Sequence, residues 1–113
     1  MEGSLGVQLF LSRLKPLLES GKLDFQPRNR RKTYEFMLSE GLTTEDAYEI
    51  IAKLKSEHHQ RGPENDYDGT PGAVCIFLYP YKTIRLYIKI KIVLGASGDT
   101  GAVMSFHEEG NYE

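Results

Sequence analysis

The chain of 113 residues is long enough for one compact domain with a modest core and too short for two. Its net charge of −2, hydrophobic share of 40% and charged share of 27% are ordinary for a globular protein, and no apolar run approaches the roughly 20 residues of a membrane-spanning helix. We therefore expect a single domain, residues 1–113, with no membrane association, and the one cysteine suits a reducing, cytoplasmic location.

The first 21 residues predict a helix. The segment "SLGVQLFLSRLKPLLESG" carries apolar residues at helical spacing, namely Leu9, Phe10, Leu14, Leu17 and Leu18. Gly21 provides a stop, and Pro16 predicts a kink or a start close upstream. The N-terminus lacks a basic segment and a small-residue cleavage site, so we expect no signal peptide. The next segment, "KLDFQP", is short and fits an extended conformation.

Two further helices follow. The segment "RNRRKTYEFMLSEGL" predicts a helix that packs Tyr34 and either Phe36 or Met37 inward, with Gly41 past its end. The segment "TTEDAYEIIAKLKSE" gives the clearest pattern, with Thr43 or Thr44 as its cap and acidic residues in its first turn. Its expected buried stripe consists of Ala47, Ile50, Ile51 and Leu54.

Residues 58–72 predict a long loop. The segment "HHQRGPENDYDGTPG" contains a Gly-Pro step, a Pro-Gly step and a run of polar residues, without apolar periodicity. Long connections of this kind are often functional. We expect residues 60–73 to be a mobile loop over or beside the functional face of the protein.

Residues 73–113 predict three β-strands. "AVCIFLY", "TIRLYIKIKIV" and "AVMSFHE" are separated by the turns "PYK" and "LGASGDTG". Consecutive strands with short connections form an antiparallel meander. Three helices followed by three strands predict an α+β fold, with the helices on one face of an antiparallel sheet and the other face open. Cys75 lies within an apolar strand, which favours a buried thiol over a nucleophile.

The second strand has two different faces. Ile84, Leu86, Ile88, Ile90 and Ile92 alternate with Arg85, Tyr87, Lys89 and Lys91. In the last strand Ala102, Met104 and Phe106 share the parity expected for the core, so Val103, Ser105 and His107 are expected on the open face. We predict that Tyr87, Lys89 and His107 lie together there and are exposed to solvent.

Arg, Tyr, Lys and His on one sheet face can hold and cleave a phosphodiester. Arg and Lys pair with phosphate oxygens, and Tyr stacks on a base or acts through its hydroxyl. Cleavage of RNA needs a base for the 2′-hydroxyl, a cation for the phosphorane and an acid for the 5′-oxygen, and none of these needs a metal. Alternating cations also serve solubility or guard a strand edge, and the pattern alone favours that explanation.

Other motifs give weaker signals. His58 and His59 are adjacent, which need not direct both rings to one ion. Residues 66–69, "DYDG", match the start of a calcium loop, but the twelfth position is Phe77 rather than a bidentate Glu. No Cys/His set has zinc spacing, so we expect no metal and no cofactor. "RNRRK" fits a solvated helix start better than a nucleic-acid patch, although it could add to one.

The C-terminal segment resembles a known family. "LYIKIKIV", followed after a Gly-rich turn by "VMSFHEEG", is similar to the C-terminal signature of MqsR-type toxins of bacterial type II toxin–antitoxin systems. The similarity is specific in residues 84–109, moderate in 61–80 and weak before residue 40. It implies a RelE-like α+β fold, a ribosome-independent mRNA endonuclease, and neutralisation by a cognate antitoxin.

The resemblance also implies site residues. The family tyrosine matches Tyr87, the last basic residue matches His107, and a family lysine falls at about Arg61. A family glutamine falls near Cys75 or Ile76, neither of which can hydrogen-bond as Gln would. We expect Tyr87, His107 and Arg61 to be catalytic, and the phosphate to be bound by the strand cations Arg85, Lys89 and Lys91. The alternatives are a non-catalytic interaction module that binds an antitoxin-like partner and a plain RNA-binding domain.

Overall fold

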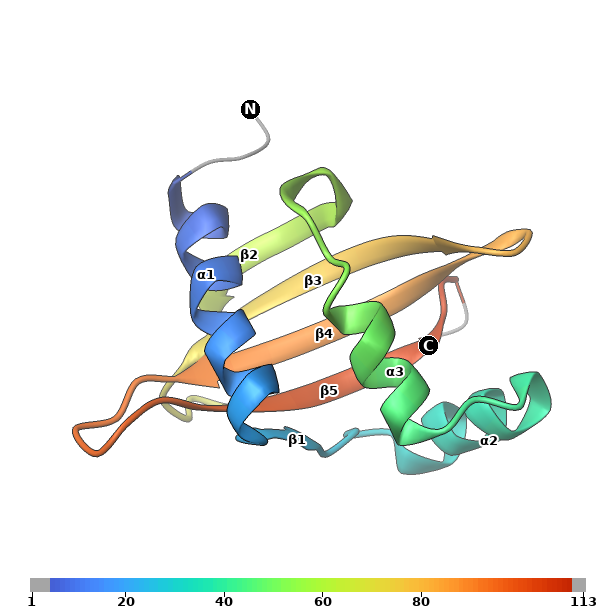
Figure 1. Ribbon diagram of the computed structural model, residues 1–113, viewed down its shortest axis with the longest axis horizontal. Helices are drawn as coiled ribbons and strands as arrows, with labels where there is room; N and C mark the ends of the chain where they lie inside the picture. Colours follow the sequence, from blue (N-terminus) through green and yellow to red (C-terminus); the bar gives the residue numbers. More distant parts are fainter. Residues whose placement is uncertain (1–4, 111–113) are drawn as a thin grey trace.

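The computed structural model describes residues 5–110, which form helices packed on a five-stranded sheet (Figure 1). The helices are α1 (Leu5–Ser20), α2 (Arg30–Glu40), α3 (Thr44–Ile51) and a short 3₁₀ helix, η1 (Ser56–His58). The strands are β1 (Leu23–Phe25), β2 (His59–Asn65), β3 (Ala73–Tyr81), β4 (Ile84–Val93) and β5 (Thr100–Glu108). The predicted α+β class is confirmed. Among these residues, no helix combines the length and the apolar character that crossing a membrane requires.

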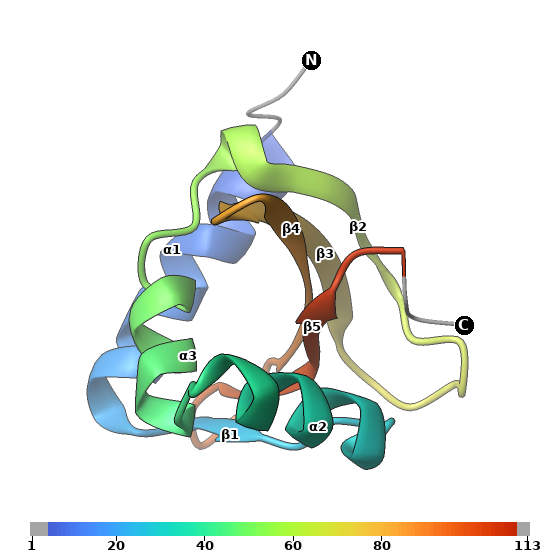
Figure 2. The ribbon, with the colours of Figure 1, turned by 90° about the vertical axis from the view of Figure 1, so that its right-hand side faces the viewer.

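The sheet has the strand order β1-β5-β4-β3-β2. β3, β4 and β5 form the predicted antiparallel meander at its centre. The extended segment after α1 becomes β1, which pairs in parallel with β5, so the sheet is mixed rather than wholly antiparallel. The α1 and α3 helices lie against one face, and α2 lies beside the β1–β5 side of the sheet (Figures 1 and 2).

The prediction of a loop from residue 58 to residue 72 is wrong over its first half. Residues 59–65 form the edge strand β2, which pairs antiparallel with β3 through two register irregularities. An edge strand is held by backbone hydrogen bonds and can expose polar side chains, so it needs no apolar alternation and tolerates Pro63. The connection that remains, residues 66–72, lies on the side of the sheet away from α1 and α3 (Figure 2).

The apolar face of β4 forms the centre of the core. Leu86, Ile88 and Ile90 are fully buried, and Phe77 of β3 and Phe106 of β5 flank them. Burial of an aliphatic or aromatic side chain of this size contributes roughly 1.5–3 kcal/mol. The α1 helix adds Phe10, Leu14 and Leu17, and it continues through Pro16 without a break.

Three details of helix packing differ from the predictions. Leu9 is 48% exposed, because the buried stripe of α1 begins at Val7 and continues through Phe10. Tyr34 is exposed, and the inward residues of α2 are Thr33 and Met37, one helical turn apart. The α3 helix ends at Ile51, so the buried Leu54 belongs to the segment after it.

The predicted helix start at Thr43 is confirmed as a reciprocal cap. The Thr43 hydroxyl accepts a hydrogen bond from the Asp46 amide at 3.1 Å, and the Asp46 carboxylate accepts one from the Thr43 amide at 2.9 Å. Gly41 ends α2 with a φ of 68°, a left-handed conformation in which a residue without Cβ is favoured.

A β-bulge in β5 changes which side chains reach the open face. Lys89 pairs with Ser105 but Ile90 pairs with Val103, so Met104 is the extra residue. The alternation therefore reverses before Met104: Val103 is buried in the core, and Ala102 pairs with Lys91 on the opposite face. The predicted placement of Val103 and Ala102 is wrong, whereas that of Ser105 and His107 is correct.

Candidate functional site

The face of the sheet away from α1 and α3, here called the open face, brings Tyr87 and His107 together. They are directly paired residues of β4 and β5. Their rings are stacked, with centroids 5.3 Å apart and planes inclined by 12°. The juxtaposition predicted from alternation is therefore confirmed, although the register that produces it depends on the bulge at Met104.

His107 is buried, which contradicts the prediction of a solvent-exposed side chain. Only 3% of its surface is exposed, while Tyr87 and Lys89 are half-buried. The imidazole lies under the Tyr87 ring, and α2 packs close enough for the charge of Lys32 to act on it. Alternation along a strand predicts which face a side chain takes, but not what neighbouring elements place over it.

The surroundings of His107 favour the neutral imidazole. Burial lowers the pKa of His107, and the charge of Lys32 lowers it further. The hydrogen bond to the backbone carbonyl of Glu108 acts in the opposite direction and raises the pKa. The Nδ1 atom lies 3.1 Å from the Glu108 carbonyl oxygen. Because a carbonyl only accepts, Nδ1 carries the proton, and Nε2 is the basic nitrogen of the ring.

Two of the predicted cations, Arg85 and Arg61, are exposed and pair with partly exposed carboxylates. Arg85 makes a two-point ion pair with Glu109, with Nε to Oε1 at 2.7 Å and Nη2 to Oε2 at 3.0 Å. Arg61 places Nε 2.9 Å from Oε1 of Glu64, and its side chain is 67% exposed. Exposed pairs of this kind contribute about 0–1 kcal/mol and open readily. Both guanidinium groups therefore stay accessible to a competing anion.

The two lysines of β4 have different environments. Lys91 is 11% exposed, and its Nζ lies 2.8 Å from the fully buried carboxylate of Asp66. Lys89 makes no ion pair with a carboxylate of residues 5–110, and its Nζ lies 5.1 Å from the centre of the Tyr67 ring. Of these two predicted phosphate ligands, Lys89 is available to a ligand and Lys91 is engaged in a structural pair.

A groove on the open face has a volume of about 280 Å³, and the accessible cations Arg61 and Lys89 line it. Arg61 of β2 pairs with Ile76 of β3, which in turn pairs with Lys89 of β4, so the three lie in a row across the sheet. Tyr87 and Tyr67 also line the groove. Ile76 is one of the two positions at which the sequence resemblance predicted a glutamine. The other, Cys75, points into the core, where burial raises its pKa to about 12.

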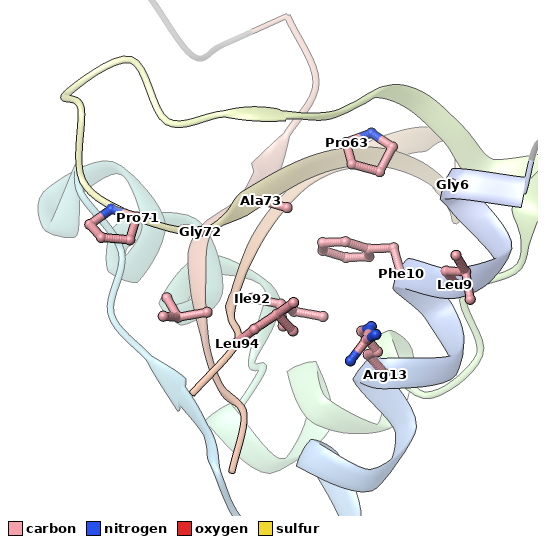
Figure 3. Close-up of a pocket in the computed structure, with 11 residues that line it drawn as sticks. Gly6, Leu9, Phe10, Arg13, Pro63, Pro71, Gly72, Ala73, Ile92 and Leu94 are labelled. Carbon is pink, nitrogen blue, oxygen red and sulfur yellow. The ribbon is translucent and has the colours of Figure 1, made fainter. Parts of the chain in front are cut away.

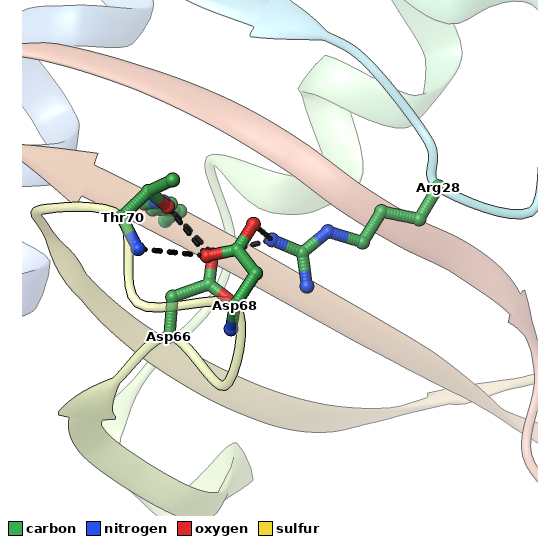
Figure 4. Close-up of polar contacts among 5 residues, drawn as sticks. Arg28, Asp66, Asp68 and Thr70 are labelled. Carbon is green, nitrogen blue, oxygen red and sulfur yellow. Dashed lines mark hydrogen bonds and ion pairs between the residues drawn. The ribbon is translucent and has the colours of Figure 1, made fainter.

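Beside the groove lies a polar network, here called the Asp66 cluster, which the sequence analysis missed (Figure 4). It consists of Arg28, Asp66, Asp68, Thr70 and Lys91. Asp66 accepts hydrogen bonds from Arg28 and Lys91, and Asp68 accepts from the Thr70 hydroxyl at 2.6 Å and the Thr70 amide at 2.9 Å. The Arg28 guanidinium holds the pKa of Asp66 well below its ordinary value, against the effect of burial.

The Asp66 cluster also explains the calcium-like motif. Asp66 and Asp68 are directed to Arg28, 38 and 40 residues away in the chain, and to Thr70. Within the described part of the chain, no group of three or more His, Cys, Asp or Glu side chains is placed to hold a metal ion. The turn signal in "DYDGT" was present in the sequence, whereas the pairing with Arg28 had no sequence signal.

The adjacent histidines have separate local roles. The Nδ1 atom of His58 accepts a hydrogen bond from the Lys55 amide at 3.0 Å and so caps η1. The Nε2 atom of His59 lies 2.7 Å from the Gly62 carbonyl oxygen. Because the two rings bond to different parts of the backbone, they do not converge on one ion.

The cationic start of α2 is also accounted for locally. The Asn29 side chain caps the helix by accepting from the Lys32 amide at 3.1 Å. Arg30 lies over the Tyr34 ring, and Arg31 pairs with Glu35 at 3.0 Å. Arg28 belongs to the Asp66 cluster, so the segment "RNRRK" does not present one continuous patch.

A separate apolar pocket of about 380 Å³ lies between α1 and the sheet, on the helix-covered side (Figure 3). Leu9, Phe10 and Arg13 of α1 face Ala73 and Ile92 of the sheet across it. Arg13 is the cation at its rim, and it already pairs with Asp99 at 3.3 Å. The lining offers burial to an apolar group but no set of side chains for chemistry.

Comparison with known proteins gives no relative. No protein-family model matches the chain, and neither a curated protein nor a solved structure matches it.

Proposed function

We propose that this protein is a cytoplasmic mRNA endonuclease, an interferase toxin of the MqsR type with a RelE-like fold, which a cognate antitoxin neutralises. The stacked pair of Tyr87 and His107, beside a groove that contains Lys89 and Arg61, is the observation that carries the proposal. The similarity of residues 84–109 to the signature of that family supports it. Both residues of the pair stand at family site positions.

The proposed chemistry is cleavage of RNA by its own 2′-hydroxyl. Neutral His107 accepts the 2′-hydroxyl proton on Nε2, and the oxygen attacks the adjacent phosphorus. The bond from phosphorus to O5′ breaks, and O5′ takes a proton from an acid in the groove, for which Tyr87 is the nearest candidate. The products are a 2′,3′-cyclic phosphate and a 5′-hydroxyl end, so atoms and protons balance.

The cations of the groove stabilise negative charge on the reacting phosphate. Lys89 and Arg61 lie in one row across the open face, on either side of Ile76. Positive charge at this position stabilises the additional negative charge of the phosphorane. Because His107 lies under the Tyr87 ring, the ring must move aside for the ribose to reach Nε2. Binding of RNA is therefore coupled to a rotation of Tyr87.

A second candidate function is a non-catalytic module that binds a protein or RNA. The pairing of Arg85, Arg61 and Lys91 with carboxylates of the same chain favours it, because those pairs reduce the charge offered to RNA. The distinction between the two functions lies in whether the buried His107 becomes accessible to a ribose.

The test is incubation of the purified protein with mixed-sequence RNA in the presence of EDTA. His107→Ala should lower the cleavage rate by roughly 10²–10⁴-fold, the usual contribution of one general base. His58→Ala is the matched control, since His58 lies outside the groove, and it should cleave like the wild type. Circular dichroism must show that each variant is folded, and His107→Gln keeps the site filled if His107→Ala is unstable.

Three outcomes separate the candidates. Cleavage that leaves cyclic phosphate ends and depends on His107 supports the interferase. RNA that is bound but stays intact points to an RNA-binding module, and no effect on RNA points to a protein-interaction module. In cells, expression of the wild type without a partner should stop growth, and expression of His107→Ala should not. The rate should fall as pH drops through the pKa of His107, which burial places below the ordinary histidine value of about 6.5, because the base acts in its neutral form.

A further inference from the structure

The connection between β2 and β3 holds Tyr67 in a defined place. Asp66, whose side chain is fully buried, is bonded to Arg28 and Lys91 on one side of Tyr67. On the other side, Asp68 is bonded to Thr70 and lies 3.1 Å from Arg28. The residue between two such anchors has little freedom in its backbone. Tyr67 is therefore presented by a fixed turn.

The Tyr67 side chain is exposed although it is large and aromatic. It is 79% exposed, and it borders the same groove as Tyr87 and Lys89. The guanidinium carbon of Arg28 lies 4.6 Å from the ring centre, and Nζ of Lys89 lies 5.1 Å from it. These cation–π contacts orient the ring but bury little of its surface. An exposed aromatic ring with cations close to it is a feature of sites that hold single-stranded nucleic acid, in which bases stack on aromatic rings and phosphates pair with cations.

We propose that Tyr67 is the platform on which one base of a single-stranded RNA stacks, beside the phosphate held by Lys89. The inference rests on the proposed function only in taking RNA as the ligand. Lys89 is two residues from Tyr87 on the same face of β4, a separation of about 6.5 Å. An RNA strand that binds Lys89 through one phosphate then places one base on Tyr67 and the neighbouring ribose near Tyr87.

This placement gives Tyr67 a role in positioning the strand rather than in bond breaking. A stacked base fixes the register of the strand, and so selects which ribose lies near Tyr87 and His107. Every base has a face that can stack, so the platform accepts all four bases. Tyr67 belongs to the turn and not to the sheet, so its replacement leaves the Tyr87–His107 pair in place.

The test uses a short 2′-O-methyl RNA, which lacks the nucleophile and cannot be cleaved, with 2-aminopurine as a fluorescent base. Fluorescence anisotropy gives Kd, and quenching of 2-aminopurine reports stacking. Tyr67→Ala should raise Kd by roughly 5- to 150-fold, the usual effect of losing one stacked base, and should abolish the quenching. Tyr67→Phe keeps the ring and should bind within about twofold of the wild type. Tyr67→Leu, which keeps bulk without the ring, should behave like Tyr67→Ala.

Tyr34→Ala is the matched control. Tyr34 is also an exposed tyrosine with a cation near its ring, Arg30 at 5.4 Å, but it lies on α2 outside the groove. Its replacement should leave Kd unchanged. If Tyr67→Ala binds and quenches like the wild type, the inference is overturned, whatever the cleavage activity.

The proposed function can fail separately. If the wild type binds the 2′-O-methyl RNA through Tyr67 but does not cleave the corresponding RNA, the interferase proposal is overturned and the stacking platform stands. If the wild type binds no oligonucleotide, both fail. If it cleaves RNA while Tyr67→Ala keeps the wild-type Kd and KM, only the stacking platform fails.

Discussion

Replacement of Asp66 by Ala should destabilise the protein by about 3 kcal/mol, a value that follows from the burial of its partners. Removal of one member of a fully buried ion pair typically costs about 3–5 kcal/mol, because a buried charge is left without a partner. Here Lys91 is 11% exposed, but Arg28 is 26% exposed and keeps a contact with Asp68 at 3.1 Å. The lower end of the range is therefore expected. With an unfolding entropy of roughly 2.1 cal/mol/K per residue, this change lowers Tm by about 13 °C.

Urea unfolding followed by circular dichroism measures this change. Asp66→Ala combined with Lys91→Met should be less destabilised than the two single variants predict, because the second substitution removes the unpaired charge. Arg31→Ala breaks an exposed pair with Glu35 and serves as the control, with a change of about 0.3–0.5 kcal/mol. A loss below about 1 kcal/mol in Asp66→Ala, or strict additivity with Lys91→Met, would refute the argument from burial.

The ion pair of Asp66 with Arg28 predicts how the free energy of unfolding depends on pH. The pKa of Asp66 is depressed in the folded protein, mainly by Arg28, against about 3.9 in the unfolded chain. The stabilisation is therefore complete above about pH 5 and is lost as pH falls through the unfolded pKa and then the folded pKa, since the unfolded chain binds the proton first. Asp66→Asn should flatten this acid limb of the unfolding free energy. An unchanged acid limb in that variant would mean that other carboxylates dominate it.

Five further single substitutions test the fold and the site. Thr43→Ala removes the reciprocal cap of α3 and should cost about 1 kcal/mol in urea unfolding, and no change would show that the cap does not matter. Gly72→Ala should cost about 1–3 kcal/mol, because φ is +127° and a Cβ would lie 2.8 Å from Cε of Lys91. Gly69→Ala, with φ +81° and open space around it, should cost less, and the reverse order would contradict the steric argument. For RNA binding, Lys89→Ala should reduce the slope of log Kd against log salt by about 0.7, whereas Lys91→Met should lower Tm and leave the slope unchanged.

Local sequence patterns predicted the helices and strands that are specified by their own residues. The alternation of residues 84–93 gave β4 and its two faces, and the capping residues at Thr43 gave the start of α3. The edge strand β2 was missed because an edge strand is stabilised by pairing with β3 rather than by its own apolar pattern. The bulge at Met104 was missed because both parities of β5 are apolar around residues 102–104, so the sequence does not show where the alternation reverses.

On the open face, too, local patterns predicted some features and missed others. Alternation predicted that Tyr87 and His107 share a face, but it did not predict that His107 is buried with the Tyr87 ring stacked on it. The Asp66 cluster joins residues 38 positions apart, Arg28 and Asp66, and no local pattern encodes that contact. Tyr67 stood in a segment noted for its aspartates, and its importance emerged only when the fold placed Arg28 and Lys89 beside its ring.

Internal carboxylates decide which cations of the open face a phosphate can reach. An anion that displaces Glu64 from Arg61 opens an exposed pair, which costs at most about 1 kcal/mol. Displacement of Asp66 from Lys91 would leave a carboxylate that has no exposed surface with Arg28 as its one remaining cationic partner among the described residues, and breaking such a buried pair costs several kcal/mol. Arg61, Arg85 and Lys89 are therefore the cations that the open face offers, while Lys91 and Arg28 hold the turn that carries Tyr67. A chain with a net charge of −2 can present a local anion site in this way, because burial and pairing, rather than the sum of charges, set which cations are free to act.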